Sequence, residues 1–248
     1  MKRILVGRRS VLEALRASPQ AISVIYLDAN DKAAMREIDD EARRRDVRLE
    51  ERDGAELDAL ATGLRHQGAV AITGEFSYLD VDTLLRKIPA ERPLLVALDE
   101  VTDPHNFGAI VRSAVAFGAD GILTLKHRAA PVTPVVVRAS AGATEHAQVA
   151  RVTNLAQTLD LLAERGMDIV GLDMDGDLLI EDLDVGPGGL VLVVGSEGRG
   201  LRRLTRERCT RIASITMPGP IASLNASVAA GIAIHHASRA RARALRTA

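Results

Sequence analysis

Hydrophobic and polar residues along the first 76 positions alternate between the period of a helix and that of a strand. Residues 11–17 and 32–45 have the spacing of amphipathic helices. Residues 21–27, 47–50 and 69–73 have the composition and length of short strands. The pattern predicts a small α/β unit for this part of the chain.

A polar stretch follows this unit and contains typical loop residues. Pro89 lies within residues 77–92, and Pro93 comes directly after them. Prolines among polar residues are typical of connections between ordered segments. We therefore expect residues 1–76 to form one domain, residues 77–92 a linker, and residues 93–248 a second domain.

Strongly apolar segments restart the alternation in the second domain. We predict four buried strands there, at residues 94–98, 121–125, 168–172 and 190–194. Strands that are apolar at nearly every position indicate a largely parallel sheet with helices on both faces. The predicted fold class is therefore α/β, and ligands of such sheets bind in the loops at the carboxyl ends of the strands.

Charge is balanced over the whole chain but not along it. The 248 residues carry a formal net charge of −1, yet residues 197–211 hold six arginines and the tail after Ala237 holds four more without an acid. Such clusters are either solvated helix faces or a surface that binds phosphate. Aromatic residues make up only 2% of the chain, so any RNA would be held through its backbone rather than by base stacking.

The single cysteine and the amino-terminal residues limit the possible classes of protein. Cys209 alone can form neither an internal disulfide nor a Cys-x-x-Cys metal site, and we expect it to be a small core residue. The first ten residues, MKRILVGRRS, have arginines where a secretory signal would be apolar. No apolar run is long enough for a membrane span. We expect a cytoplasmic protein.

The first candidate loop follows the strand at residues 94–98 and reads EVTDPHNFGAIVRSAVAF. We expect Asn106 to cap a helix over residues 107–117, which Gly118 ends. Arg112 lies among apolar residues of that helix. It either extends to solvent, pairs with an acid, or forms a fixed cation that points into the cleft.

The second candidate loop lies within LVLVVGSEGRGL, residues 190–201. Three glycines in six residues indicate a tight turn that a ligand approaches closely. Leu201 stands where a phosphate-binding P-loop needs lysine, and the glycine spacing is not that of a dinucleotide fingerprint. Glu197 would repel a pyrophosphate and suits a hydroxyl, an amine or a cationic ligand.

The third candidate loop precedes the last helix. We predict a strand at residues 215–217, a turn at residues 218–220, and a helix whose first turn holds Ser223, Asn225 and Ser227. A helix cap requires one side-chain oxygen, and three polar residues in five positions exceed that need. From the spacing alone, these residues either cap the helix or belong to a binding site.

Three stretches resemble, in order and spacing, the motifs of the SpoU (TrmH-type) RNA 2′-O-methyltransferases. They read NFGAIVRSA, LVLVVGSEGRGL and ITMPGPIASLNASVAAGIAI. Four more, EVTDPHNFGA, ARVTNLAQTL, RRLTRERC and RHQGAVAI, are similar to the subfamily that methylates a guanosine ribose in the peptidyl-transferase region of bacterial 23S rRNA. The resemblance covers nearly the whole chain.

This resemblance implies a fold that periodicity could not indicate. It is an α/β SPOUT-type catalytic domain with a C-terminal trefoil knot that holds S-adenosyl-L-methionine, preceded by a small L30e-like RNA-binding domain. The implied partners are 23S rRNA and a second copy of the chain, with no metal and no membrane. The implied homodimer packs through its knot regions, and the small-residue face of the last helix would allow that packing: Ala226, Ala229, Ala230 and Ala233.

The resemblance also implies the site residues. The cofactor would contact mainly the backbone of Gly195, Ile215 and Leu224. The active-site positions would be Asn106, Arg112, Glu197, Ser223 and Asn225. Because guanidinium groups stay protonated in proteins, we expect the family's catalytic arginine to stabilise the developing alkoxide and hold phosphate rather than act as a simple base. The two asparagines would orient this arginine and the ribose, and the glutamate would hold the arginine or the RNA.

Two alternatives remain open at this point. The three motifs are shared by tRNA ribose methyltransferases of the same family. A catalytically silent RNA-binding or ribosome-assembly protein could also use this fold, although every active-site position carries the expected residue.

Overall fold

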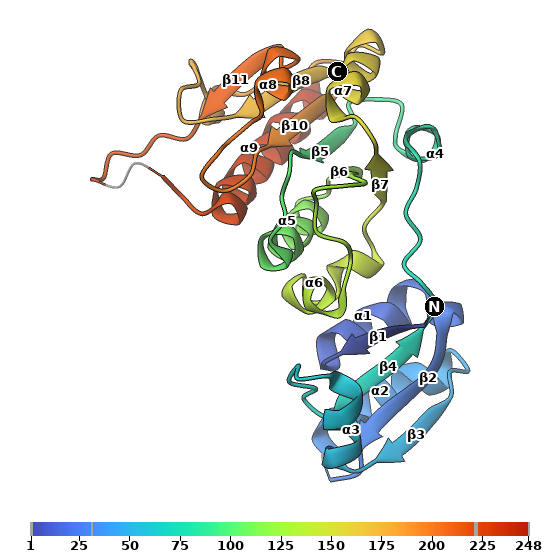
Figure 1. Ribbon diagram of the computed structural model, residues 1–248. Helices are drawn as coiled ribbons and strands as arrows, with labels where there is room; N and C mark the ends of the chain where they lie inside the picture. The colour runs from blue at the N-terminus through green and yellow to red at the C-terminus, as the bar shows by residue number, and fades with distance from the viewer. Residues whose placement is uncertain (1, 31, 221–222, 248) are drawn as a thin grey trace. The chain divides into compact units, whose positions relative to one another are not determined.

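The chain forms two compact units in the computed structural model, which describes residues 2–30, 32–220 and 223–247, and only the backbone of residues 32–35. The first unit comprises residues 1–77 together with 131–146, and the second comprises residues 78–130 and 147–248 (Figure 1). The three-part division expected from the sequence stays a prediction. The contacts add residues 131–146 to the amino-terminal unit.

A four-stranded sheet forms the centre of the first unit, in the order β1-β4-β2-β3. β4 is antiparallel to both of its neighbours, whereas β2 and β3 are parallel. The predicted helices and strands are confirmed to within a few residues, and β1 and α3 are additions. The elements are β1 (Arg3–Val6), α1 (Arg8–Ala17), β2 (Ile22–Asp28), α2 (Lys32–Arg44), β3 (Leu49–Arg52), α3 (Gly54–Ala61) and β4 (Ala69–Thr73).

Residues 131–146 pack against the elements of this first unit. They contain α6 (Pro134–Ala139) and a short 3₁₀ turn, η2 (Ala143–Glu145). Val137 of α6 is fully buried in the same cluster as Leu5 and Leu15. Arg3 donates two hydrogen bonds to the carboxylate of Glu145, at 2.9 and 2.7 Å. A shared apolar core and an ion pair therefore attach this segment to the sheet.

A seven-stranded sheet forms the centre of the second unit, in the order β7-β6-β5-β10-β8-β11-β9. Every neighbouring pair is parallel. All positions of β5, β6 and β10 are buried, which confirms the prediction of a parallel sheet covered on both faces. The strands are β5 (Leu94–Leu98), β6 (Gly121–Leu125), β7 (Val149–Val152), β8 (Asp168–Leu172), β9 (Leu178–Leu179), β10 (Leu190–Val194) and β11 (Arg211–Ser214).

Five helices accompany this sheet in the described residues: α4 (Val81–Lys87), α5 (Pro104–Ala116), α7 (Leu155–Glu164), α8 (Arg203–Glu207) and α9 (Ala226–Thr247). α5 and α9 pack against each other, and α9 also contacts β5 and β10. The stretch expected as a linker contains α4, whose Leu84 is fully buried in the core. Gly121 leaves room for that side chain, since a Cβ there would lie 2.6 Å from a Leu84 methyl carbon. This part of the stretch is therefore a packed element.

The small residues of α9 are used within the chain. Ala226, Ala230 and Ala233 are all buried, and Ala229 lines the pocket described below. Three of the four alanines of the expected face are thus covered by this chain's own elements, and packing of α9 against a second copy stays a prediction. The trefoil knot stays a prediction. Among the described residues, no helix has the length and hydrophobicity that a membrane span requires.

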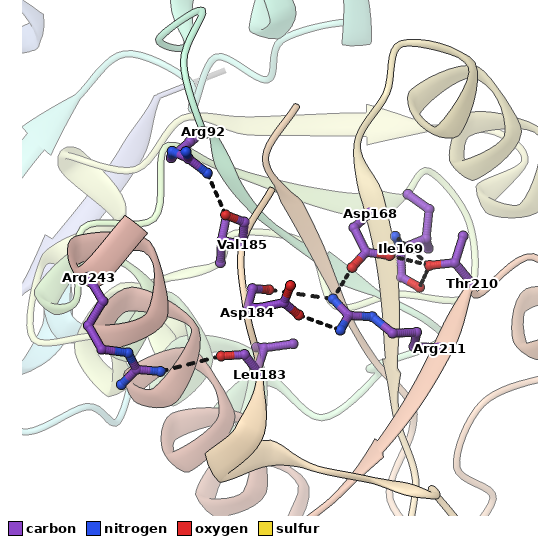
Figure 2. A network of polar contacts seen from close by, with 9 residues as sticks. All are labelled: Arg92, Asp168, Ile169, Leu183, Asp184, Val185, Thr210, Arg211 and Arg243. Atoms are coloured by element: carbon purple, nitrogen blue, oxygen red, sulfur yellow. Dashed lines mark hydrogen bonds and ion pairs between the residues drawn. The ribbon is translucent and has the colours of Figure 1, made fainter. Parts of the chain in front are cut away.

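A polar network holds the segment before β10 at the end of the sheet where β8 begins (Figure 2). Arg211 forms ion pairs with Asp168 and Asp184. Two further arginines donate to backbone carbonyl groups of the same segment, Arg92 to Val185 at 2.6 Å and Arg243 to Leu183 at 3.4 Å. This network lies at the end where β8 begins. The candidate site is expected at the opposite end, where the parallel strands have their carboxyl ends.

Candidate functional site

A pocket of about 780 Å³ lies at the carboxyl ends of β8 and β10, beside the chain that follows β11. This volume is within the range of small-molecule sites. Backbone and apolar groups form much of its wall, and acidic side chains lie among them. Its lining residues are Leu172 to Asp175, Val194 to Gly200, Ile215, Met217, Ser223 to Ala226 and Ala229. The pocket thus joins two of the three loops predicted from the sequence.

The glycine turn after β10 forms one wall of this pocket. Ser196 and Gly200 exchange two backbone hydrogen bonds, at 3.1 and 3.0 Å, which close the turn. A Cβ on Gly195 would lie 2.2 Å from the carbonyl carbon of Gly200, so no side chain fits there. Gly198 and Gly200 have φ angles of 80° and 65°, in the left-handed region that favours glycine. The glycines of the turn therefore present backbone to a ligand, and Glu197 and Arg199 add their side chains to the same wall.

A buried carboxylate anchors the far end of the turn. Asp99, at the carboxyl end of β5, has no exposed surface. It accepts hydrogen bonds from the Arg202 backbone N–H at 2.9 Å and from Arg202 Nε at 2.6 Å. A buried charge is stable only when it is paired and hydrogen-bonded, as this one is. Asp99 thus fixes the chain directly after the glycine turn.

Three of the predicted active-site residues form a hydrogen-bonded trio, which we call the Asn–Glu–Asn trio. Asn106 of α5 donates through Nδ2 to Glu197 Oε2 at 2.8 Å. Asn225 donates through Nδ2 to Asn106 Oδ1 at 2.9 Å and lies 3.4 Å from Glu197 Oε2. Residues from all three candidate loops are therefore brought together. The Glu197 Oε1 atom accepts no hydrogen bond from the described residues, so it is available to a ligand.

The expected caps are partly wrong and partly confirmed. Asp103 caps α5 by accepting hydrogen bonds from the backbone N–H groups of His105 and Asn106, so Asn106 lies inside the helix and is not its cap. Asn225 does act as a cap, because its Oδ1 accepts from the Ser227 N–H at 2.9 Å and from the Val228 N–H at 3.4 Å. Its Nδ2 remains free for the trio.

The remaining predicted residues divide between the pocket and the surface. Ile215, Ser223 and Leu224 line the pocket. The strand expected at residues 215–217 is instead β11, which ends at Ser214 because its partner β8 ends at Leu172. Arg112 is exposed on α5 and does not line the pocket. Ile221 and Ala222, within the third motif, lie outside the described residues.

The charged groups of the pocket favour a cationic ligand. Asp173 and Asp175 line it together with Glu197, and Arg199 is the only arginine or lysine among the lining residues. Asp173 is already paired with Arg206 at 2.5 Å. The two aspartates were missed as site residues, although their place directly after β8 was a usable signal.

Cys209 is confirmed as a core residue and is not part of the site. It packs against the apolar core beneath the sheet, and its Sγ donates to the Thr205 carbonyl group at 3.3 Å. Burial raises the pKa of the Cys209 thiol to about 12. A thiol that stays protonated at neutral pH is a poor nucleophile.

Two family models match the chain. One is described as the SpoU rRNA Methylase family and matches residues 93–235. The other is described as RNA 2′-O ribose methyltransferase substrate binding and matches residues 4–79. Together they span both parts of the chain that the sequence pattern separated.

Similar proteins agree with these models. An uncharacterized tRNA/rRNA methyltransferase from Mycolicibacterium vanbaalenii is 44% identical over 241 residues, which cover 96% of this chain and 76% of that protein. The SpoU methyltransferase AviRb from Streptomyces viridochromogenes, solved with the cofactor AdoMet, has a TM-score of 0.79 at 28% identity, covering 98% of this chain and 91% of that one. An AdoMet-bound rRNA methyltransferase from Sinorhizobium meliloti has a TM-score of 0.77 at 25% identity, covering 96% and 87%.

Proposed function

The chain belongs to the SpoU rRNA methylase family and is an RNA methyltransferase that uses S-adenosyl-L-methionine, and from this premise we propose that it methylates the 2′-hydroxyl of a guanosine ribose in 23S rRNA. One observation supports the proposal most strongly. A turn that presents backbone to the pocket lies beside the Asn–Glu–Asn trio, which combines amide and carboxylate groups of three separate loops.

The residues of the pocket fit this cofactor. S-adenosyl-L-methionine supplies a methyl group on a positively charged sulfur. Gly195, Ile215 and Leu224 would contact it mainly through backbone groups, since all three line the pocket and the turn at Gly195 admits no side chain. Asp175 and Glu197 favour its positive charge over a neutral analogue.

The trio would position the ribose. Glu197 Oε2 is held by Asn106 and Asn225, which leaves Oε1 to accept a hydrogen bond from the substrate hydroxyl. Ser223, on the pocket wall, would contact the ribose or the methyl group. Holding the hydroxyl in line with the methyl group removes much of the entropic barrier, which in the best intramolecular models amounts to about 7–11 kcal/mol.

Arg112 would act at this site from a second copy of the chain. Its guanidinium is exposed, makes no hydrogen bond or ion pair to the described residues, and lies outside the lining of its own pocket. We propose a homodimer in which Arg112 of one copy stabilises the developing alkoxide beside the pocket of the other and holds an RNA phosphate.

Mixing two inactive variants tests this arrangement. Arg112→Ala should retain cofactor binding and lose methyl transfer. Gly195→Ala should bind the cofactor roughly 10- to 100-fold more weakly, so it should be nearly inactive when the cofactor concentration is kept below the wild-type Kd. In a heterodimer of the two variants, one site combines the intact Gly195 of one copy with the intact Arg112 of the other. Activity should therefore return after mixing. Activity of Arg112→Ala near that of the wild type would reject the role of this arginine. Two inactive variants that stay inactive after subunit exchange would reject its action from the second copy.

The choice of 23S rRNA depends on the likeness of the quoted stretches to the subfamily that methylates a guanosine ribose of 23S rRNA, and on the match of residues 4–79 to a substrate-binding model. Such a substrate would place the reaction in the cytoplasm. The test is to incubate the enzyme and labelled S-adenosyl-L-methionine with separated 23S rRNA, 16S rRNA and tRNA from a strain that lacks the enzyme. Label in 23S rRNA supports the proposal, whereas label in tRNA alone favours a tRNA ribose methyltransferase. The absence of label in every RNA would favour a silent RNA-binding protein.

A further inference from the structure

Three consecutive basic residues follow β6 at the same edge of the sheet as the pocket. Lys126, His127 and Arg128 are all exposed, and we call them the basic loop. β6 is parallel to β5, which is parallel to β10, so the three strands end at one edge. Their carboxyl ends are also level, because Thr124 pairs with Leu98, and Leu98 pairs with Val194.

This register places the basic loop close to the pocket. β6 and β10 are separated by one intervening strand, and neighbouring strands lie about 4.8 Å apart, so the two strand ends are about 10 Å apart. The glycine turn follows β10 directly, and the helix that carries Asn106 follows β5. The basic loop is therefore next in line across the sheet edge from the elements that form the site.

The backbone around the basic loop is strained and held in place. Arg128 and Glu100 both have a φ angle of 58°, which is unfavourable for residues with long side chains. They face each other in an ion pair at 3.1 Å, and Glu100 also lies 3.4 Å from Arg202. The Ala130 N–H donates to the Val101 carbonyl group at 3.0 Å. Such strain persists only where surrounding contacts enforce it, and it concentrates at functional sites.

The charges of the basic loop are available to a ligand. Lys126 and His127 make no side-chain hydrogen bond or ion pair with the described residues, and the side chain of Arg128 is 73% exposed despite its contact with Glu100. An exposed row of nitrogen donors that includes the positive charges of Lys126 and Arg128 matches the sugar–phosphate backbone of a nucleic acid. Few aromatic residues are present to bind it by stacking.

We propose that Lys126, His127 and Arg128 bind the phosphate backbone of the substrate RNA beside the nucleotide that enters the pocket. This assignment rests on the proposed function and adds a contact in the catalytic unit to the binding expected of the amino-terminal one. The loop would determine how the RNA enters the site, while the pocket alone binds the cofactor.

The test compares two double variants that remove the same charge. Lys126→Ala with Arg128→Ala removes two cations from the basic loop. Arg86→Ala with Lys87→Ala removes two from the end of α4, just before the chain enters β5 at its amino end. Affinity for a 23S rRNA transcript is measured over a range of salt concentrations, together with methyl transfer and cofactor affinity. We expect the loop variant to bind RNA about tenfold more weakly and to lower the slope of log affinity against log salt by about 1 to 2. Its KM for RNA should rise while its cofactor affinity stays unchanged, and the α4 variant should match the wild type.

The results distinguish failure of the basic loop from failure of the proposed function. If the loop variant keeps the wild-type slope and the wild-type KM for RNA, the basic loop does not bind the backbone, and the proposed function is unaffected. If the wild type binds RNA but transfers no methyl group, the proposed function fails, and the comparison of slopes still decides the role of the loop. If the wild type does not bind RNA at all, both are rejected.

Discussion

Replacing Gly195 by alanine is the sharpest test of the pocket as the cofactor site. The added Cβ would lie 2.2 and 2.3 Å from the carbonyl carbon and oxygen of Gly200, and 2.6 Å from the Leu201 nitrogen. All three atoms belong to the backbone, so no side chain can rotate away to make room. The turn must open, and its two hydrogen bonds between Ser196 and Gly200 must lengthen or break.

The size of the effect follows from these contacts. Overpacking costs about 1–3 kcal/mol, and each lost hydrogen bond costs about 0.5–1.5 kcal/mol. Opening the turn relieves the overlap between the added Cβ and the backbone of Gly200 and Leu201. It also moves the backbone that we propose contacts the cofactor, so part of those contacts is lost. At about 1.4 kcal/mol for each factor of ten, we expect the Kd for S-adenosyl-L-methionine to rise roughly 10- to 100-fold. The total cost is about 2–6 kcal/mol against about 5–15 kcal/mol for the unfolding of a typical domain, so the variant should be less stable than the wild type, and its folding is measured beside its affinity.

Isothermal titration with S-adenosyl-L-methionine measures this Kd, and thermal unfolding shows whether the variant is folded. Gly186→Ala is the matched control, because a Cβ there meets no atom within 4 Å. A folded Gly195→Ala variant that binds the cofactor within threefold of the wild type would refute the assignment of this turn to the cofactor.

Further predictions concern the trio, the anchor of the turn and the network at the other end of the sheet. Asn106→Asp places a carboxylate where an amide now donates to Glu197 at 2.8 Å. We expect kcat for methyl transfer to fall at least about tenfold, while the Kd for the cofactor changes little. An unchanged kcat would show that the trio does not position the ribose. Asp99→Asn removes the charge that pairs with Arg202, and we expect the free energy of unfolding in urea to fall by about 2 kcal/mol. The control Glu207→Gln, in an exposed ion pair, should lower it by less than about 0.5 kcal/mol. Equal losses would show that Asp99 does not anchor the turn. The hydrogen bond from Arg211 lowers the pKa of Asp184 below its ordinary value of 3.8, so its contribution to stability is present above about pH 4 and is lost as the pH falls through the lowered pKa. The wild type should be more stable than Asp184→Asn by less than about 1 kcal/mol, because the pair is exposed. This difference should shrink below pH 4. A difference that grows there would mean that the pKa of Asp184 is raised rather than lowered.

Local sequence signals predicted most elements of the fold but not their ends. Four strands of the second sheet, β5, β6, β8 and β10, could be located to the residue, because runs of mainly apolar residues leave few alternatives. β7 and β9 were not predicted, and β11 was expected a few residues too late in the chain. The cap of α5 was misassigned although the signal was present. Asp103 followed by Pro104 is the usual start of a helix, and this start leaves the Asn106 side chain free to reach Glu197.

Tertiary contacts account for what the sequence could not indicate. α4 has one fully buried residue, Leu84, and depends on the space beside Gly121, which lies far along the chain. The contact between Asn106 and Glu197 joins positions 91 residues apart and requires β5 and β10 to be neighbours in register. The site residues were identified by resemblance, and their spacing alone would not have joined them. Sequence alone could not assign residues 131–146 to the first unit. The ion pair that attaches them, between Glu145 and Arg3, joins positions far apart in the chain.

The position of the transferred methyl group shows directly whether this protein is a guanosine ribose methyltransferase of 23S rRNA. 23S rRNA from a strain lacking the enzyme is incubated with the protein and labelled S-adenosyl-L-methionine, then digested to nucleosides and analysed by mass spectrometry. We expect 2′-O-methylguanosine at one position, with the neighbouring phosphodiester resistant to alkali, and no such product from Arg112→Ala. A methyl group on a base, or on the ribose of a different nucleotide, would contradict the proposed function.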